Sequence, residues 1–182
     1  MIKKVSVRDM IYASMLAALT GILGYVIIPL PFSPVPITGQ TLAIMLIGLV
    51  LSPFMSFMSV AIFLLLGIIG IPVFSGGQAG IGVLIGPKGG YLIGFLIGAV
   101  VISLIRKNSN NFIRMAISSL IGGVLVVYLM GVPWLAYITG MNIKKALLVG
   151  ALPFIPGDLL KMVVALFIAR KINNLLQKEV AR

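Results

Sequence analysis

Long apolar stretches, interrupted by proline, glycine and a few charged residues, make up most of this sequence. Between Asp9 and Lys88 the chain contains no Asp, Glu, Lys or Arg. Because about 20 consecutive apolar residues are enough to cross a bilayer as a helix, these stretches predict membrane spans. The interruptions divide them into six spans. We place the spans at residues 11–28, 39–51, 54–71, 91–105, 112–130 and 156–169.

The composition favours the same class of protein. Of the 182 residues, 60% are hydrophobic and 9% are charged, whereas a soluble domain carries about 25% charged residues. We therefore predict an all-α integral membrane protein with six transmembrane helices in a single membrane domain, residues 1–182. The first span resembles a signal peptide, but no small-residue cleavage site leads into a polar mature sequence, so we expect it to be retained.

Two connecting segments have unusual compositions. Residues 29–38 contain four prolines, which forbid a continuous helix and favour an extended connector. Residues 73–90 are too rich in glycine for a stable helix and too apolar for an ordinary soluble loop. Irregular backbone at membrane depth is tolerated only where protein or a water-lined cavity satisfies its polar groups. We therefore predict a re-entrant glycine-rich loop between the third and fourth helices, and an interfacial aromatic pair, Trp134 and Tyr137, after the fifth.

The positions of the charges predict the topology. A net charge of +11 would indicate nucleic acid binding in a soluble protein, but here the basic residues flank apolar spans, where they meet lipid headgroups. With six spans, one side carries ten of them: Lys3, Lys4, Arg8, Arg106, Lys107, Arg114, Arg170, Lys171, Lys178 and Arg182. The other side carries Lys88, Lys144 and Lys145. The positive-inside rule therefore places both termini in the cytoplasm, and both unusual connectors and the start of the sixth span outside.

Asp158 and Lys161 are the most informative charged residues. Asp158 is the only acid within the membrane region, where a charged side chain costs roughly 2.5–3.5 kcal/mol at mid-span. The i, i+3 spacing puts the two on one helical face, so they can neutralise each other. One interpretation is a capping aspartate with a lysine that extends to the interface. We favour a polar pair facing a pocket open to the outside, because a cap needs no lysine one turn deeper.

The glycine-rich segment excludes one function and suggests another. Its runs GGQAGIG and GPKGG resemble phosphate-binding loops, but the GxxxxGK sequence followed by Ser or Thr is absent. The chain therefore cannot use ATP by itself. The glycines would allow backbone groups to approach a small ligand closely; the alternative is a flexible external linker. The candidate ligand contacts here are Gln78, Gly89, Gly90 and Tyr91.

Small residues recur in the first span, at Ala13, Ala17 and Gly21. This spacing lines one helical face and allows a second helix to pack closely, either from a partner protein or from the same chain. The sequence has no His, no Cys and no second acid within the membrane region. Metal sites and acid–base pairs therefore lack their parts, and we expect no enzymatic activity and no cofactor.

Three motifs resemble those of one known family. PFSPVPITGQTL (31–42), GIPVFSGGQAGIGVLIGPKGGYLIGF (70–95) and FIPGDLLKMVVA (154–165) are similar to motifs of the BioY family. These proteins are the biotin-specific substrate-binding S components of energy-coupling factor (ECF) transporters. The length, the six spans and the motif order agree over nearly the whole chain. The chain departs from the family at Lys88, where threonine is usual, and at Gly39, where an apolar residue is favoured.

The resemblance implies high-affinity capture of biotin outside a bacterial cell membrane. Delivery would go through a transmembrane coupling protein and two cytoplasmic ATPases. It implies that Asp158 and Lys161 hold the biotin head group, that residues 78–91 close over the ligand, and that Ala13 and Ala17 contact the coupling protein. Several groups remain candidates for the biotin carboxylate: Gln78, Lys88, Gln40 and loop N–H groups.

Two other functions compete with this interpretation. An ion-coupled secondary transporter of a small carboxylated solute could use Asp158 as its proton carrier, although inverted repeats and a second ionisable group on another helix are missing. A structural or assembly protein, binding only lipid, would tolerate Gly→Ala changes throughout residues 76–90.

Overall fold

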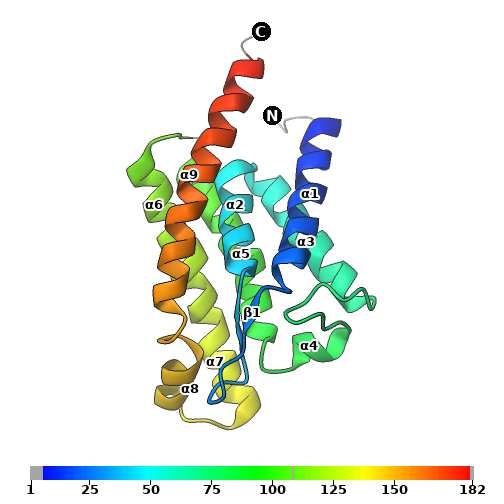
Figure 1. Ribbon diagram of the computed structural model, residues 1–182, viewed down its shortest axis with the longest axis vertical. Coiled ribbons are helices and arrows are strands. Elements are labelled where there is room, and N and C mark those ends of the chain that lie inside the picture. Colours follow the sequence, from blue (N-terminus) through cyan, green and yellow to red (C-terminus); the bar gives the residue numbers. More distant parts are fainter. Residues whose placement is uncertain (1–5, 108, 181–182) are drawn as a thin grey trace.

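The computed structural model describes residues 6–107 and 109–180, which are mostly helical (Figure 1). In chain order the elements are α1 (Val7–Leu23), β1 (Ile27–Ile28), β2 (Ile37–Thr38), α2 (Gln40–Val50), α3 (Pro53–Ile68), α4 (Ile81–Ile85), α5 (Gly89–Arg106), α6 (Phe112–Ser119), η1 (Leu120–Val126), α7 (Val127–Thr139), α8 (Ile143–Gly150) and α9 (Ile155–Val180). In Figure 1 the start of α1 and the end of α9 lie at the same end of the bundle, and β1, α4 and α8 lie toward the other end.

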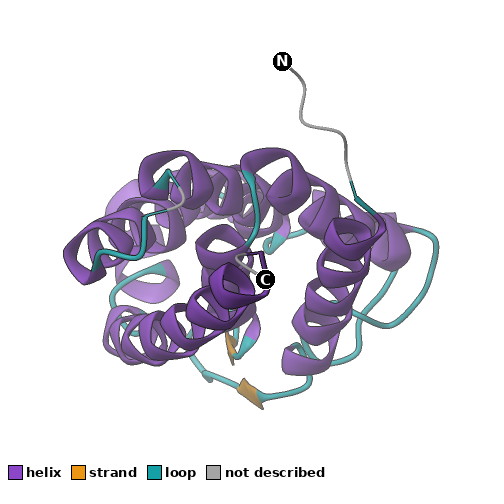
Figure 2. Cartoon of the chain, turned by 90° about the horizontal axis from the view of Figure 1, so that it is seen from above, coloured by secondary structure: helices purple, strands orange, loops and turns teal. Residues whose placement is uncertain are grey.

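The bundle is organised around α2 and α5. Seven consecutive residues of α2, Ala43–Leu49, are buried, so this short apolar helix is enclosed by its neighbours. Helix α5 packs against α2, α3 and α7. The crossing between α5 and the π-helical segment η1 is close, because a Cβ on Gly98 would lie 2.4 Å from the carbonyl oxygen of Gly122. Seen along the long axis, the helices pack side by side, with the short strands on one flank (Figure 2).

The first helix is shorter than the expected span, and a small β-ribbon follows it. A capping box starts α1: the Ser6 hydroxyl accepts from the backbone N–H of Asp9, and the Asp9 carboxylate accepts from that of Ser6. The helix ends at Leu23, five residues before the expected boundary. Residues 27–28 instead pair antiparallel with residues 37–38. The proline-rich connector between them is therefore extended, as expected, but it also positions the strand that precedes α2.

The fifth apolar helix continues past its expected end at residue 130. Residues 112–139 form one apolar helix of 28 residues, and Pro133 lies on its exposed side within the last turns. The two aromatic residues of the expected interfacial pair differ in exposure. Tyr137 is 83% exposed, whereas Trp134 is partly buried and its Nε1–H donates to the carbonyl of Gly86 at 2.9 Å. Trp134 therefore holds α7 against the segment that precedes α5.

The glycine-rich segment folds as turns around one short helix. Phe74 and Gln78 form a β-bridge, and the two residues at its tip, Gly76 and Gly77, have φ of +73° and +74°. Positive φ is a conformation that glycine adopts without strain. The Gly76 N–H donates to the carbonyl of Gly24. The segment is thus fixed to the end of α1.

By length and hydropathy, two helices among the described residues can cross a membrane, Gly89–Arg106 and Phe112–Thr139. A third is obtained if α8 and α9, bent by 48° where they meet, count as one span. Helices α2 and α3 are apolar but shorter. At the far end, α9 continues to Val180, beyond the expected boundary at residue 169.

Candidate functional site: a pocket around Asp158

A pocket lies in the half of the bundle away from the termini. Its walls come from side chains within residues 35–41, 74–75, 83–88, 91–95, 127–128 and 154–161, so the proline-rich connector, the glycine-rich segment and the start of α9 meet here, as the sequence predicts. We call it the Asp158 pocket. Its volume is about 50 Å³, below the roughly 300–1,000 Å³ of typical small-molecule sites. A ligand larger than a few atoms must therefore widen it.

The Asp158 carboxylate is the most buried charge in the pocket. The residue is 3% exposed. Its Oδ1 accepts from the Thr41 hydroxyl at 2.8 Å and from the Lys161 ammonium at 2.9 Å, and its Oδ2 accepts from the Tyr128 hydroxyl. A carboxylate has about four lone-pair sites. With three of them occupied, Asp158 can accept another hydrogen bond from a ligand N–H.

Lys161 pairs with Asp158 and connects α9 to α2. Its side chain is 19% exposed. The ammonium donates to the backbone carbonyl of Thr38 at 2.6 Å, to the Thr41 hydroxyl at 3.0 Å and to Asp158. These contacts use all three of its donors. A ligand carbonyl that binds Lys161 must therefore replace one of the neutral acceptors. Both residues line the pocket, and the printed donors to the Asp158 carboxylate are side chains rather than backbone N–H groups of its own helix, which disfavours the simple capping interpretation.

Two other predicted site residues line the same pocket. Gln40 is buried, and its side-chain amide donates to the carbonyl of Val73 at 3.2 Å, which holds the glycine-rich segment against α2. The Tyr91 hydroxyl donates to the carbonyl of Gly150 at 2.7 Å, and its ring lies edge-on to Tyr128. The polar atoms used in these contacts hold the pocket walls. Both residues also line the pocket.

Three predicted ligand contacts lie elsewhere. Gly89 and Gly90 are buried between α5 and its neighbours and are not in the pocket wall. A Cβ on Gly89 would lie 1.7 Å from the carbonyl oxygen of Leu84, and one on Gly90 would lie 2.3 Å from the Trp134 Cβ. These glycines allow close backbone packing in this structure, and their role as ligand contacts stays a prediction. Gln78 lies outside the pocket, in a neighbouring groove.

Four pocket residues were not predicted from the sequence. Thr41 and Tyr128 bind Asp158 directly, the Thr38 carbonyl binds Lys161, and Ser75 contacts Lys88. Tyr128 could have been found, because it is an isolated hydroxyl within the apolar run VLVVYLM. The Thr38 contact uses a backbone carbonyl and therefore leaves no side-chain signal in the sequence.

The small-residue face of the first helix is internal. Ala13 is 1% exposed and Ala17 is 2% exposed. The Ala13 carbonyl accepts from the buried Ser59 hydroxyl of α3 at 2.7 Å, and a Cβ on Gly21 would lie 3.1 Å from Val73. This face packs within the chain, so it offers no surface to a partner in this conformation. Partner docking at Ala13, Ala17 and Gly21 stays a prediction, and in this conformation these residues pack within the chain.

The pocket suits binding rather than catalysis or metal coordination. No group of three His, Cys, Asp or Glu side chains occurs within the described part of the chain. The pocket offers one ion pair, hydroxyl groups and a largely aromatic and aliphatic wall including Phe74, Phe95 and Phe154. Such a site suits a ligand with a compact polar group attached to an apolar body.

Comparisons with known proteins point to one family. The profile of the BioY family matches residues 1–178. The biotin transporter BioY of Rhizobium etli is 37% identical over 176 residues, covering 92% of this chain and 94% of that protein. The probable biotin transporter BioY of Bacillus subtilis is 37% identical over 171 residues, covering 92% and 91%. A crystal structure of the S-component for biotin from an ECF-type ABC transporter superposes with a TM-score of 0.87 at 34% identity, covering 92% of each chain.

Proposed function

The chain belongs to the BioY family, and on that premise we propose that it is the biotin-binding S component of an ECF-type transporter. It is a transporter component rather than an enzyme. The observation that carries the proposal is the Asp158–Lys161 ion pair, whose side chains are 4% and 19% exposed and which lines a pocket. Folding stability does not explain why an ion pair is present here, since replacing a buried ion pair with apolar residues is often neutral or stabilising.

The chemistry of biotin matches the hydrogen-bonding capacity of this pocket. The ureido ring has two N–H donors and one carbonyl acceptor, attached to a thioether ring and an aliphatic tail. Asp158 can accept from a ring N–H, and Lys161 can donate to the ring carbonyl once it releases the Thr41 hydroxyl. The aromatic wall would surround the thioether ring. This arrangement requires no cofactor in the chain itself, and ATP would be used only by partner subunits.

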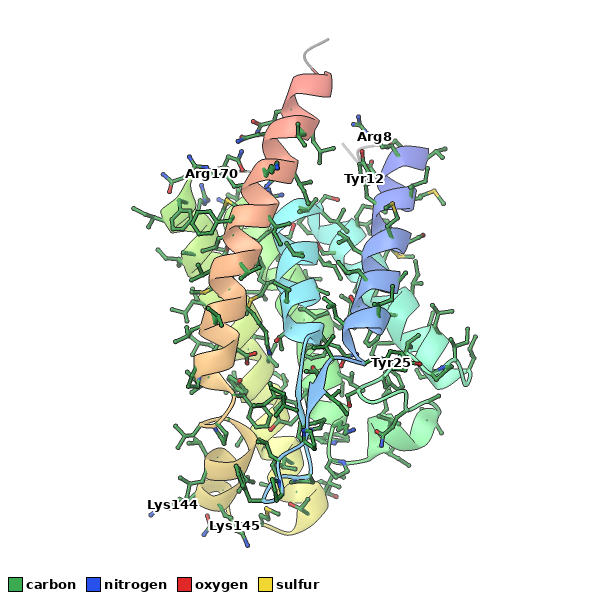
Figure 3. The ribbon with its side chains drawn as sticks, viewed as in Figure 1. Arg8, Tyr12, Tyr25, Lys144, Lys145 and Arg170 are labelled. Atoms are coloured by element: carbon green, nitrogen blue, oxygen red, sulfur yellow. The ribbon has the colours of Figure 1, made fainter. Side chains whose placement is uncertain are left out.

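The proposed topology has six membrane helices, with both termini in the cytoplasm of a bacterial cell and the Asp158 pocket open to the outside. Figure 3 shows Arg8 at the end of the termini and Lys144 and Lys145 at the opposite end, so the topology rests on the larger number of basic residues assigned to the first end. Helix α2 would lie below the outer surface, enclosed by its neighbours. The glycine-rich segment would lie at the outer surface, since its short helix α4 has no buried residue.

Binding of biotin by the purified chain tests the function. We expect saturable, stoichiometric binding in detergent or nanodiscs by isothermal titration calorimetry. Cells expressing the chain with an ECF coupling protein and its two ATPases should accumulate biotin, and a Walker A variant of the ATPases should abolish that uptake. An ion-coupled transporter would instead be insensitive to the ATPases. Ion-coupled transport is disfavoured because a proton carrier must accept a proton, and the Asp158 carboxylate already accepts hydrogen bonds from Lys161 and two hydroxyl groups.

The proposed coupling protein requires an accessible face of the bundle. On α1, Ser14 and Ala18 form the small-residue pair on the exposed side, next to Met15 and Ile22, each 64% exposed. We propose that the coupling protein packs against this face. The two faces of α1 can be separated by substitutions one residue apart.

Tryptophan substitutions at Ala17 and Ala18 should impair different properties: the first the folding of the protein, the second only the uptake of biotin. Ala17→Trp places a large ring in a closely packed interior and should remove folded protein, because overpacking is costly. Ala18→Trp should bind biotin normally but reduce ATP-driven uptake at least tenfold. The measurements are size-exclusion profile, biotin affinity and cellular uptake. Normal uptake by the Ala18 variant would show that this face of α1 does not contact the coupling protein.

A further inference from the structure

Lys88 lies at the boundary between two hollows. It lines the Asp158 pocket and also an outer groove, formed by Pro34, Gln78, Ala79, Gly82, Val83, Gly86, Pro87 and Lys88. The groove has a volume of about 460 Å³ and is more open than the pocket. Among the charged side chains that line the pocket, Lys88 is therefore the one that also lines the outer groove.

The contacts of Lys88 hold the ammonium but leave its charge unbalanced. The Nζ donates to the Ser75 hydroxyl at 2.8 Å and to the Gln78 side-chain carbonyl at 2.7 Å. Both acceptors are neutral, and one of the three donors remains available. Among the described residues, no carboxylate lies within 4 Å of it. It shares no hydrogen-bond partner with Lys161, so the pocket contains two separate polar centres.

The surroundings disfavour a cation at this position. Lys88 immediately precedes α5, where the positive end of the helix dipole lies. Partial burial lowers the pKa of the Lys88 ammonium, because desolvation disfavours the charged form. The sequence has three acids, of which Asp9 is near the N-terminus, Glu179 is near the C-terminus and Asp158 is already paired. The chain therefore supplies no anion for Lys88.

We infer that Lys88 binds the carboxylate of the ligand tail and makes the pocket selective for the free acid. The inference rests on the proposed function and deepens it. With the ureido ring at Asp158 and Lys161, the aliphatic tail would extend along the apolar wall toward the mouth. A carboxylate there would take the available donor of Lys88 and balance its charge. The amide of the same acid has no charge and would lose this interaction, so conjugated forms of biotin would be excluded.

The test compares biotin with biotin amide, which differ only at the tail. We expect the unmodified protein to bind biotin at least tenfold more tightly. Lys88→Met should weaken biotin binding by about 10-fold to 100-fold, the range expected for a charge-assisted hydrogen bond, and should change amide binding by less than about threefold. Lys88→Arg should keep the preference for the acid. The control is Lys144→Met, which removes an exposed lysine on α8 at the same end and should change neither affinity.

Several outcomes would overturn the inference. Equal affinity of the unmodified protein for biotin and biotin amide would do so whether or not any variant folds. An equal loss of both ligands in Lys88→Met and Lys88→Arg would show that Lys88 only holds Ser75 and Gln78 in place. If the unmodified protein bound neither ligand, the proposed function itself would fail. The single tryptophan, Trp134, hydrogen-bonds two residues from Lys88, so its fluorescence can report all of these titrations.

Discussion

Replacing Asp158 with asparagine is expected to lower biotin affinity by about 100-fold to 1,000-fold. The amide keeps one oxygen acceptor but loses the charge that strengthens a hydrogen bond from a ring N–H. It also leaves the Lys161 ammonium, at 19% exposure, without its counter-ion. Breaking a buried ion pair costs roughly 3–5 kcal/mol, so the variant should also denature at a lower temperature. Calorimetric titration with biotin and a thermal unfolding scan in the same detergent measure both effects.

Two controls separate binding from stability. Asp9→Asn removes an acid of the α1 capping box, far from the pocket, and should leave biotin affinity unchanged. The double variant Asp158→Leu with Lys161→Met removes both charges and should recover stability relative to either single change, because neither charge is left alone. It should still fail to bind biotin. Recovery of binding together with stability would mean that the pair has only a structural role.

Gly89→Ala is expected to destabilise the protein strongly, whereas Gly82→Ala should not. A Cβ on Gly89 would lie 1.7 Å from the backbone oxygen of Leu84, so α4 and α5 would have to separate. A Cβ on Gly82 meets no atom within 4 Å. Overpacking costs about 1–3 kcal/mol and sometimes more, and each kcal/mol corresponds to roughly 2–4 °C in a chain of this size. The unfolding midpoints of the two variants give the comparison.

The same pair of substitutions tests the role of the glycine-rich segment. Because the contact between Gly89 and Leu84 exists whatever the function, the unfolding midpoint alone does not separate a structural or lipid-binding protein from a biotin-binding one. The affinity of both variants for biotin must be measured as well. If Gly89→Ala had a normal midpoint and lowered only the affinity for biotin, the glycine would be a ligand contact after all. Equal midpoints and affinities for both variants would contradict the close packing between Leu84 and Gly89.

The class of fold could be predicted from hydrophobic patterning, but several boundaries could not. Placing a helix end at each proline or glycine is sound where water can bind the backbone groups that lose their helical partner. Inside an apolar bundle, Gly131 instead allows the Tyr91 ring to approach the helix, and the helix continues through Pro133 to Thr139. The opposite error occurred after Leu23, where apolar residues form a strand. The strand depends on partners nine and eleven residues away, which periodicity cannot reveal.

Four of the seven predicted ligand contacts line the Asp158 pocket, and the reason is physical. Asp158 and Lys161 were found because a charge in an apolar region is costly and needs an explanation. Gln40 and Tyr91 lie beside the two connectors that the topology brings together. Gly89 and Gly90 lie outside the pocket wall, because glycine permits close approach of any atom and here that atom belongs to the chain. The face of Ala13 and Ala17 packs internally, since small residues do not distinguish an internal neighbour from a partner.

The most direct measurement is a structure of this chain with biotin bound. The account predicts a widened Asp158 pocket with a ureido N–H within hydrogen-bond distance of the Asp158 carboxylate. It also predicts the ureido oxygen on the Lys161 ammonium, in place of the Thr41 hydroxyl. Biotin bound elsewhere, with the contacts among Asp158, Lys161, Thr41 and Tyr128 unchanged, would contradict it.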